Sequence, residues 1–101
     1  MSGVVFTPRA KLHLLAIWDY SVEQWGERRT DDYLREINTT ILNAANGRRI
    51  LRPCDQYGAG MKSLRSGSHT IYLRYDAEAD AFLVLGVLHQ HLEPSRHLKE
   101  D

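Results

Sequence analysis

Two apolar stripes at helical spacing occupy the first half of the chain, and they constrain the fold more than any other feature. Within residues 8–25 the first stripe recurs at three- and four-residue steps: Leu12, Leu15, Trp18, Val22 and Trp25. The second stripe begins at about Thr30 and comprises Tyr33, Leu34, Ile37, Ile41, Ala44 and Ala45. Because only about three or four residues separate the two patterns, we expect an antiparallel helical hairpin whose stripes face one core.

The ends of both helices carry recognisable signals. Thr7 followed by Pro8 is a typical N-cap with proline at the first helical position. Gly26 and Gly47 are typical stop signals for the first and the second helix. Residues 4–6, Val-Val-Phe, favour a short strand. The chain is therefore predicted to begin with a strand that leads into two helices.

The second half of the chain has the pattern of strands. Residues 62–65 and 69–75 flank Ser-Gly-Ser, a sequence typical of a hairpin turn. In the second of these strands apolar residues alternate with polar ones, which predicts one buried and one solvated face. The expected buried set is Ile71, Leu73 and Tyr75, and the expected polar set is Thr70, Tyr72 and Arg74. Residues 81–88, AFLVLGVL, are apolar on both faces, as in a central strand.

Two segments lack a sustained period. Residues 48–61 contain Pro53, Gly58 and Gly60, and we expect them to form a surface excursion. The end of the chain, residues 92–101, is polar, and Glu93 followed by Pro94 can start a short helix or an extended arm. The predicted order is β-α-α-β-β-β, an α+β fold in which a helical hairpin packs on a mainly antiparallel sheet.

Length and hydropathy restrict the class of protein. At 101 residues the chain has room for one core, so we expect a single domain over residues 1–101. No apolar run is long enough for a bilayer, and the first residues lack the pattern of a signal peptide. We therefore expect a cytoplasmic protein with no membrane partner.

Charge and cysteine content exclude further classes. The net charge of zero argues against a protein held on nucleic acid mainly by phosphate neutralisation, and we expect no sequence-specific binding of nucleic acid by this chain alone. The charge is nevertheless uneven, since residues 48–75 carry six basic side chains against one acidic side chain, Asp55; the basic strip comprises Arg48, Arg49, Arg52, Lys62, Arg65 and Arg74. Such a strip can attract an acidic partner. Cys54 is the only cysteine, so an internal disulfide is impossible, and we expect no metal and no cofactor.

Five segments in this order resemble the ParE family of the RelE/ParE toxin superfamily. They are IWDYSVEQWG in the first helix, YLREI in the second, CD in the loop, SGSHTIYLRY in the hairpin and VLHQ at the end of the last strand. The resemblance spans nearly the whole chain. It implies a RelE/ParE-like fold and the toxin of a type II toxin–antitoxin module, of the kind that serves plasmid stabilisation.

The resemblance also implies partners. A ParD-like antitoxin would wrap the toxin with a flexible C-terminal segment, giving a toxin–antitoxin hetero-oligomer. The target would be DNA gyrase, through its A subunit, inhibited by protein–protein binding rather than by enzymatic action. Relatives usually have an Arg-rich stretch after the Cys-Asp pair, whereas this chain has QYGAGMKS with Lys62 as its one base. That departure motivates an alternative in which the chain is a non-toxic scaffold that binds antitoxin.

A second alternative is a RelE-like, ribosome-dependent mRNA endonuclease. Cleavage of RNA needs a base near the 2′-hydroxyl, cations on the phosphate and an acid for the leaving oxygen. The available set is Arg65, His69, Arg74 and His89, which could share one concave face. The dense Lys/Arg cluster and the C-terminal tyrosine of many such nucleases are missing from this sequence. We therefore expect no catalytic residues.

The residues that we expect to bind partners belong to two surfaces. An apolar groove between the helical hairpin and the sheet would take the antitoxin, and the basic strip would attract its acidic part. The exposed face of the first helix, the loop around Asp55 and the C-terminal arm would contact gyrase, so deletion of residues 92–101 should weaken toxicity and leave the core strand intact. The candidate binding residues are Trp18, Trp25, Arg52, Asp55, Lys62, Arg65, Tyr72, Arg74, His89 and Arg96.

Overall fold

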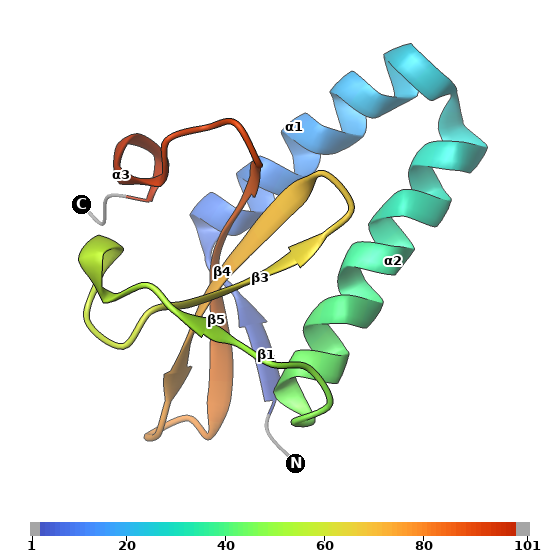
Figure 1. Ribbon diagram of the computed structural model, residues 1–101. Helices are drawn as coiled ribbons and strands as arrows, with labels where there is room; N and C mark the ends of the chain where they lie inside the picture. Colours follow the sequence, from blue (N-terminus) through green and yellow to red (C-terminus); the bar gives the residue numbers. More distant parts are fainter. Residues whose placement is uncertain (1–2, 99–101) are drawn as a thin grey trace.

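The computed structural model describes residues 3–98 and has two helices packed across one face of a five-stranded sheet (Figure 1). Its elements are β1 Gly3–Phe6, α1 Pro8–Trp25, α2 Glu27–Ala45, β2 Arg52–Pro53, η1 Asp55–Tyr57, β3 Lys62–Ser66, β4 His69–Asp76, β5 Ala81–His89 and α3 Pro94–His97. This confirms the predicted α+β fold and adds a short strand, β2, within the predicted surface loop. No helix within residues 3–98 is long and apolar enough to cross a bilayer.

The sheet has the strand order β1-β5-β4-β3-β2. Strand β1 pairs in parallel with β5, and the other neighbours are antiparallel, so the sheet is mainly antiparallel as predicted. The long connection that a parallel pair requires runs through the two helices and then through β2, β3 and β4. Strand β5 lies between β1 and β4, and its side chains enter cores on both faces of the sheet, which explains why its sequence is apolar on both faces.

The predicted start of α1 is confirmed in detail. The hydroxyl oxygen of Thr7 accepts a hydrogen bond from the amide of Ala10 at 3.2 Å, and the same hydroxyl donates to the carbonyl of Val84 at 3.0 Å. The N-cap therefore also ties the helix to the centre of the sheet. Helix α1 ends at Gly26, whose φ of +84° suits glycine.

The connection between the helices is shorter than predicted. Gly26 alone joins them, and α2 begins at Glu27 rather than at about Thr30. The spacing of apolar residues does not predict this first turn of α2, because the turn contains Glu-Arg-Arg. These residues favour a helix, but their side chains are exposed and add nothing to the apolar stripe.

The buried face of α1 differs from the predicted stripe. Ala10, Ile17 and Ser21 are buried, whereas Leu12 is 66% exposed and Leu15 is 57% exposed. Trp18 and Val22 are half-buried. The prediction that Leu12 and Leu15 face the core was wrong. Hydropathy identifies an apolar face of a helix but does not show whether the rest of the protein covers it. The helix packs through a face with small residues, which allow close approach to its neighbours.

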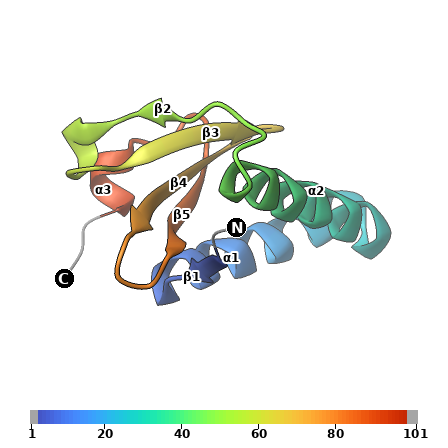
Figure 2. The same ribbon diagram turned by 90° about the horizontal axis from the view of Figure 1, so that it is seen from below.

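Two cores lie on the two faces of the sheet. The first lies under the helices and includes Ile37, Ile41, Ile71, Leu73, Val84 and Val87. The second comprises Cys54, Met61, Tyr72, Leu85, Leu88 and Leu98, supplied by the loop before β3, the two central strands and the end of α3. Figure 2 shows α3 away from α1 and α2.

The second core overturns the expected polar face of β4. Tyr72 is only 7% exposed, because residues 54–61 and Leu98 cover that face, whereas Tyr75 on the expected buried side is 45% exposed. The predicted role of Tyr72 as an exposed binding residue is therefore wrong. The short helix predicted at Glu93 is confirmed as α3, with the Glu93 carboxylate accepting from the Ser95 amide at 3.2 Å. Residues 99–101 of the predicted arm lie outside the described residues.

Candidate functional site

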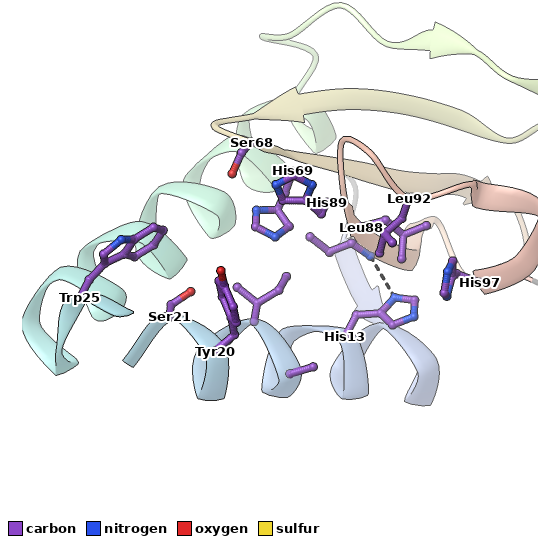
Figure 3. A pocket seen from close by; sticks show the side chains of 13 residues that line it. His13, Tyr20, Ser21, Trp25, Ser68, His69, Leu88, His89, Leu92 and His97 are labelled. Atoms are coloured by element: carbon purple, nitrogen blue, oxygen red, sulfur yellow. Dashed lines mark hydrogen bonds between the residues drawn. The ribbon is translucent and has the colours of Figure 1, made fainter. Parts of the chain in front are cut away.

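A groove with a volume of about 660 Å³ opens between α1 and the ends of β4 and β5 (Figure 3). Its lining is His13, Ala16, Ile17, Tyr20, Ser21, Trp25, Ser68, His69, Val87, Leu88, His89, Leu92 and His97. This lining contains no Asp, Glu, Lys or Arg. The groove is therefore an apolar surface in which histidines supply most of the polar atoms, and its size is typical of a binding cleft.

A bulge in β5 shapes the floor of the groove. Tyr72 pairs with Gly86 and Leu73 pairs with Val84, so Leu85 has no partner in β4. Beyond the bulge, the amide of Val87 donates to Nδ1 of His13 at 3.2 Å, which joins the strand to α1 (Figure 3). A β-carbon at Gly86 would lie 3.0 Å from the His13 ring and 2.5 Å from Leu98, so only glycine allows these side chains to approach.

His69 forms part of the opposite wall and is only 9% exposed. The Tyr33 hydroxyl lies 2.6 Å from Nδ1 of His69, and the Ser68 amide donates to the same hydroxyl at 3.2 Å. Burial, with a further contribution from the nearby His89, lowers the pKa of His69 to about 4. The imidazole is therefore uncharged at neutral pH.

Aromatic rings form a continuous row from the rim of the groove to its wall. The ring centroids of Trp25 and Tyr33 are 5.9 Å apart, and those of Tyr33 and His69 are 5.5 Å apart. His69 and His89 follow at 5.5 Å, as direct partners across β4 and β5, and His91 lies 5.0 Å from His89. These contacts hold the polar atoms of the wall in fixed positions.

The structure brings few of the predicted binding residues to the groove. Trp25 and His89 line it, whereas the half-buried Trp18 does not. Arg52, Lys62, Arg65 and Arg74 belong to the strands β2 to β4, and Arg96 is exposed on α3. Asp55 has a local structural role, since its carboxylate accepts from the Gly60 amide at 2.8 Å.

The four residues proposed for RNA cleavage do not share one face. Ile71 and Leu73 of β4 pack under the helices, so strand alternation places His69 on that side and Arg74 on the other. In β3, Leu64 packs under the helices, which places Arg65 on the opposite side. Arg65 donates a hydrogen bond to the Gln90 side chain. The expectation of a common concave face was therefore wrong. It required Arg65 and Arg74 to point to the same side of the sheet as His69, and they point to the other side.

Sequence reasoning missed most of the groove. His13, Tyr20, Leu92 and His97 line it, and Tyr33 fixes its wall from behind. His13, Ile17 and Tyr20 are spaced four and three residues apart, which indicates a common face of the helix. The spacing does not show which part of the protein that face packs against. Burial raises the pKa of the Cys54 thiol, which suits its place in the second core. Within residues 3–98 no three His, Cys, Asp or Glu side chains are arranged to hold a metal ion.

Comparisons with known proteins agree with this architecture. The family described as "ParE toxin of type II toxin-antitoxin system, parDE" matches residues 4–93. Toxin ParE1 of Mycobacterium tuberculosis is 38% identical over 97 residues, covering 96% of this chain and 98% of the relative. Toxin ParE1 of Caulobacter vibrioides is 34% identical over 90 residues, covering 89% and 91%.

Two solved structures share the fold. The chromosomal ParDE toxin–antitoxin system of P. aeruginosa contains a chain that matches with a TM-score of 0.72 and 17% identity, covering 88% of this chain and 96% of that one. The toxin–antitoxin complex RelBE2 of Mycobacterium tuberculosis matches with a TM-score of 0.57 and 22% identity, covering 87% and 96%. At these identities the likeness establishes the fold alone.

Proposed function

Because this chain belongs to the ParE toxin family of type II toxin–antitoxin systems, we propose that it inhibits DNA gyrase by binding it, and that an antitoxin neutralises it by placing an apolar segment in the groove. Inhibition requires no catalytic residue in this chain, only a surface that the antitoxin makes unavailable or distorts. The ParD-like identity of the antitoxin and the gyrase A subunit as the point of contact belong to the same proposal.

The apolar lining of the groove, which contains no Asp, Glu, Lys or Arg, carries this proposal. Tyr20, Trp25 and Leu92 are exposed around a floor that includes Ile17, Val87 and Leu88. Large apolar side chains gathered in a concave surface are typical of a site for another protein. An amphipathic helix could fill such a groove with side chains three and four residues apart.

The basic strip supports a second contact with an acidic part of the antitoxin. Arg48 and Arg49 are exposed in the segment between α2 and β2, and Arg52 is exposed at the start of β2. Ile50, which lies between them in the sequence, is 90% exposed. This segment lies outside the groove. An antitoxin that occupies the groove and reaches this segment would have to run across the surface of the toxin.

The same geometry weighs against cleavage of mRNA. The residues that line the groove include no cation to hold a scissile phosphate, and the pKa of His69 is too low for an efficient general base at neutral pH. Arg65 and Arg74, which could hold a phosphate, lie on the other side of the sheet from His69. A surface of this kind fits a protein better than a phosphodiester.

The first test is a supercoiling and cleavage assay with purified toxin, gyrase, plasmid and ATP. We expect linear DNA or loss of supercoiling, reversed by the antitoxin. If gyrase is unaffected, mRNA cleavage is tested on translating ribosomes. A toxin that affects neither gyrase nor mRNA, and does not arrest growth when induced alone, would be a non-toxic antitoxin-binding scaffold.

The groove itself is tested with Ala16→Arg. Ala16 is exposed on α1 and lines the groove, so the arginine side chain should occupy it without disturbing the core. We expect the Kd for the antitoxin to rise about tenfold or more, measured by isothermal titration calorimetry. Gln24→Arg is the matched control, because Gln24 is exposed on α1 outside the groove and should leave the Kd unchanged. Equal affinities of the two variants would show that the antitoxin binds elsewhere.

A further inference from the structure

The hydrogen bond to His13 fixes the position of the proton on its ring. The Val87 amide is 3.2 Å from Nδ1 of His13, and a backbone N–H can only donate. Nδ1 is therefore the acceptor, and in the uncharged ring the proton must be on Nε2. Burial, followed by the nearby His97 and Arg9, lowers the pKa of His13, which favours this uncharged form.

The contacts of Tyr33 favour one position for the proton on His69. The phenol oxygen accepts from the Ser68 amide at 3.2 Å. Its own hydrogen has three possible acceptors, of which Nδ1 of His69 at 2.6 Å is much closer than the Ser66 carbonyl at 3.4 Å or the Ser68 hydroxyl at 3.3 Å. The shortest of these contacts favours Nδ1 of His69 as the acceptor, and with that assignment the ring proton is on Nε2.

Both rings line the groove, His13 from α1 and His69 from β4 (Figure 3). Within residues 3–98, neither Nε2 atom has a hydrogen-bond partner. His69 is held between the rings of Tyr33 and His89, each 5.5 Å away, so its donor cannot readily turn elsewhere. An apolar groove with two fixed, unpartnered N–H donors favours an occupant with oxygen atoms at matching positions.

We propose that His13 and His69 recognise the antitoxin segment by donating their Nε2 hydrogens to uncharged oxygen atoms in it. Such atoms are main-chain carbonyls or the side-chain oxygens of Asn, Gln, Ser or Thr. A carboxylate fits less well, because the groove lining has no Lys or Arg to compensate for its loss of water. This inference rests on the proposed function, and it makes the two histidines specificity-determining residues of the groove.

The position of the protons is tested first, in the free protein. Long-range ¹H–¹⁵N NMR spectra distinguish a protonated ring nitrogen from an unprotonated one. We expect His13 and His69 to show unprotonated Nδ1 and protonated Nε2 at pH 7. A protonated Nδ1 on either ring would overturn the proposal for that residue.

Recognition is tested with a pair of substitutions at His69. In His69→Gln the amide group can still donate near the position of Nε2, whereas His69→Leu has a similar size and no donor. With a purified ParD-like antitoxin, we expect His69→Leu to raise the Kd about 3- to 10-fold, as for the loss of one hydrogen bond, and His69→Gln to recover most of the affinity. The same pair at His13 should behave alike. His91→Leu is the control, because His91 is exposed and does not line the groove.

The outcomes separate this inference from the proposed function. If the wild-type toxin does not bind the antitoxin, the proposed function is wrong and the recognition step is wrong with it. If the wild type binds and the Leu and Gln variants bind equally well, the groove site stands and the donor role is wrong. Circular dichroism and thermal melts identify a variant that fails to fold. If the Leu variant does not fold, the donor role is tested by the affinity of the Gln variant and by a shift of the Nε2–H resonance of the wild type on binding.

Discussion

At the scale of single residues, the close approach of α1 and α3 to the sheet depends on Gly86. The position opposite Tyr72 in β5 has the His13 ring on one side and the Leu98 side chain on the other. The groove and the second core therefore meet at a residue that has no side chain. His13 lies beside this point, so the packing of a few atoms determines where one of the hydrogen-bond donors of the groove lies.

Gly86→Ala should destabilise the protein. The added methyl group would lie 2.5 Å from Leu98 and 3.0 Å from the His13 ring, so we expect the free energy of unfolding to fall by about 1–3 kcal/mol. Urea denaturation followed by circular dichroism measures it. Gly3→Ala is the control, since its nearest neighbour would be 3.7 Å away, an ordinary contact. A loss of stability no larger than that of the control would contradict the close packing at Gly86.

Acid should destabilise the protein through His69. The pKa of this residue is about 4 in the folded state, below the ordinary 6.5, so the unfolded chain binds more protons between these pH values. Its contribution is complete above about pH 6.5 and is lost as the pH falls towards 4. The expected loss is on the order of 3 kcal/mol. Urea denaturation from pH 7 to 4 measures it, and His69→Gln should give a flatter profile. Parallel profiles for the two proteins would refute the prediction.

At the scale of elements, α1 has two apolar faces with different uses. One face, with Ala10, Ile17 and Ser21, packs into the protein. Another presents Leu12 and Leu15 to solvent, and Ala16 and Tyr20 border the groove. An apolar stripe that the protein does not bury is available to a partner, which agrees with the proposed contact between this helix and gyrase.

Truncations on the two faces of α1 should have different effects. Ile17 is 8% exposed, so Ile17→Ala should lower the free energy of unfolding by about 2–4 kcal/mol. Leu12→Ala should change it by less than about 0.5 kcal/mol, because most of this side chain is already in water. Thermal melts and urea denaturation of both variants provide the comparison. Similar losses would mean that Leu12 is buried and that the assignment of faces is wrong.

At the scale of the whole molecule, residues 92–98 of the predicted C-terminal arm pack against the rest of the protein. Leu98 is buried in the second core and Leu92 lines the groove. Removal of residues 92–101 would therefore expose the second core, contrary to the expectation that the core strand would remain intact. A surface change such as Arg96→Ala, at an exposed position of α3, is the better way to ask whether the arm contacts gyrase.

Salt should affect how fast the antitoxin binds more than how fast it leaves. The groove lining has no Asp, Glu, Lys or Arg, whereas the basic strip lies on the segment before β2 and on the strands β2 to β4. Apolar contacts should then limit dissociation, and attraction between the strip and an acidic segment should speed association. Stopped-flow measurements over about 0.05–0.5 M salt should show a falling association rate constant and a smaller change in the dissociation rate constant. An association rate that is independent of salt would exclude this role of the strip.

The sequence by itself determined the order of the main helices and strands apart from β2, the helical hairpin, the N-cap at Thr7, the turn before β4 and the central place of β5. These features depend on residues close to one another in the chain, whose spacing and caps can be read directly. The apolar spacing did not reveal which face of α1 is buried, because that choice depends on the shape of what the face meets.

Only the tertiary structure decided the site. The bond between His13 and Val87 joins residues 74 positions apart, and the bond between Tyr33 and His69 joins residues 36 apart. Strand register and the bulge at Leu85 determine which side chains share a face, and they separate Arg65 and Arg74 from the histidines. The groove is formed by segments that are far apart in the sequence, so no local sequence pattern predicts it. It forms only when the helices pack on the sheet.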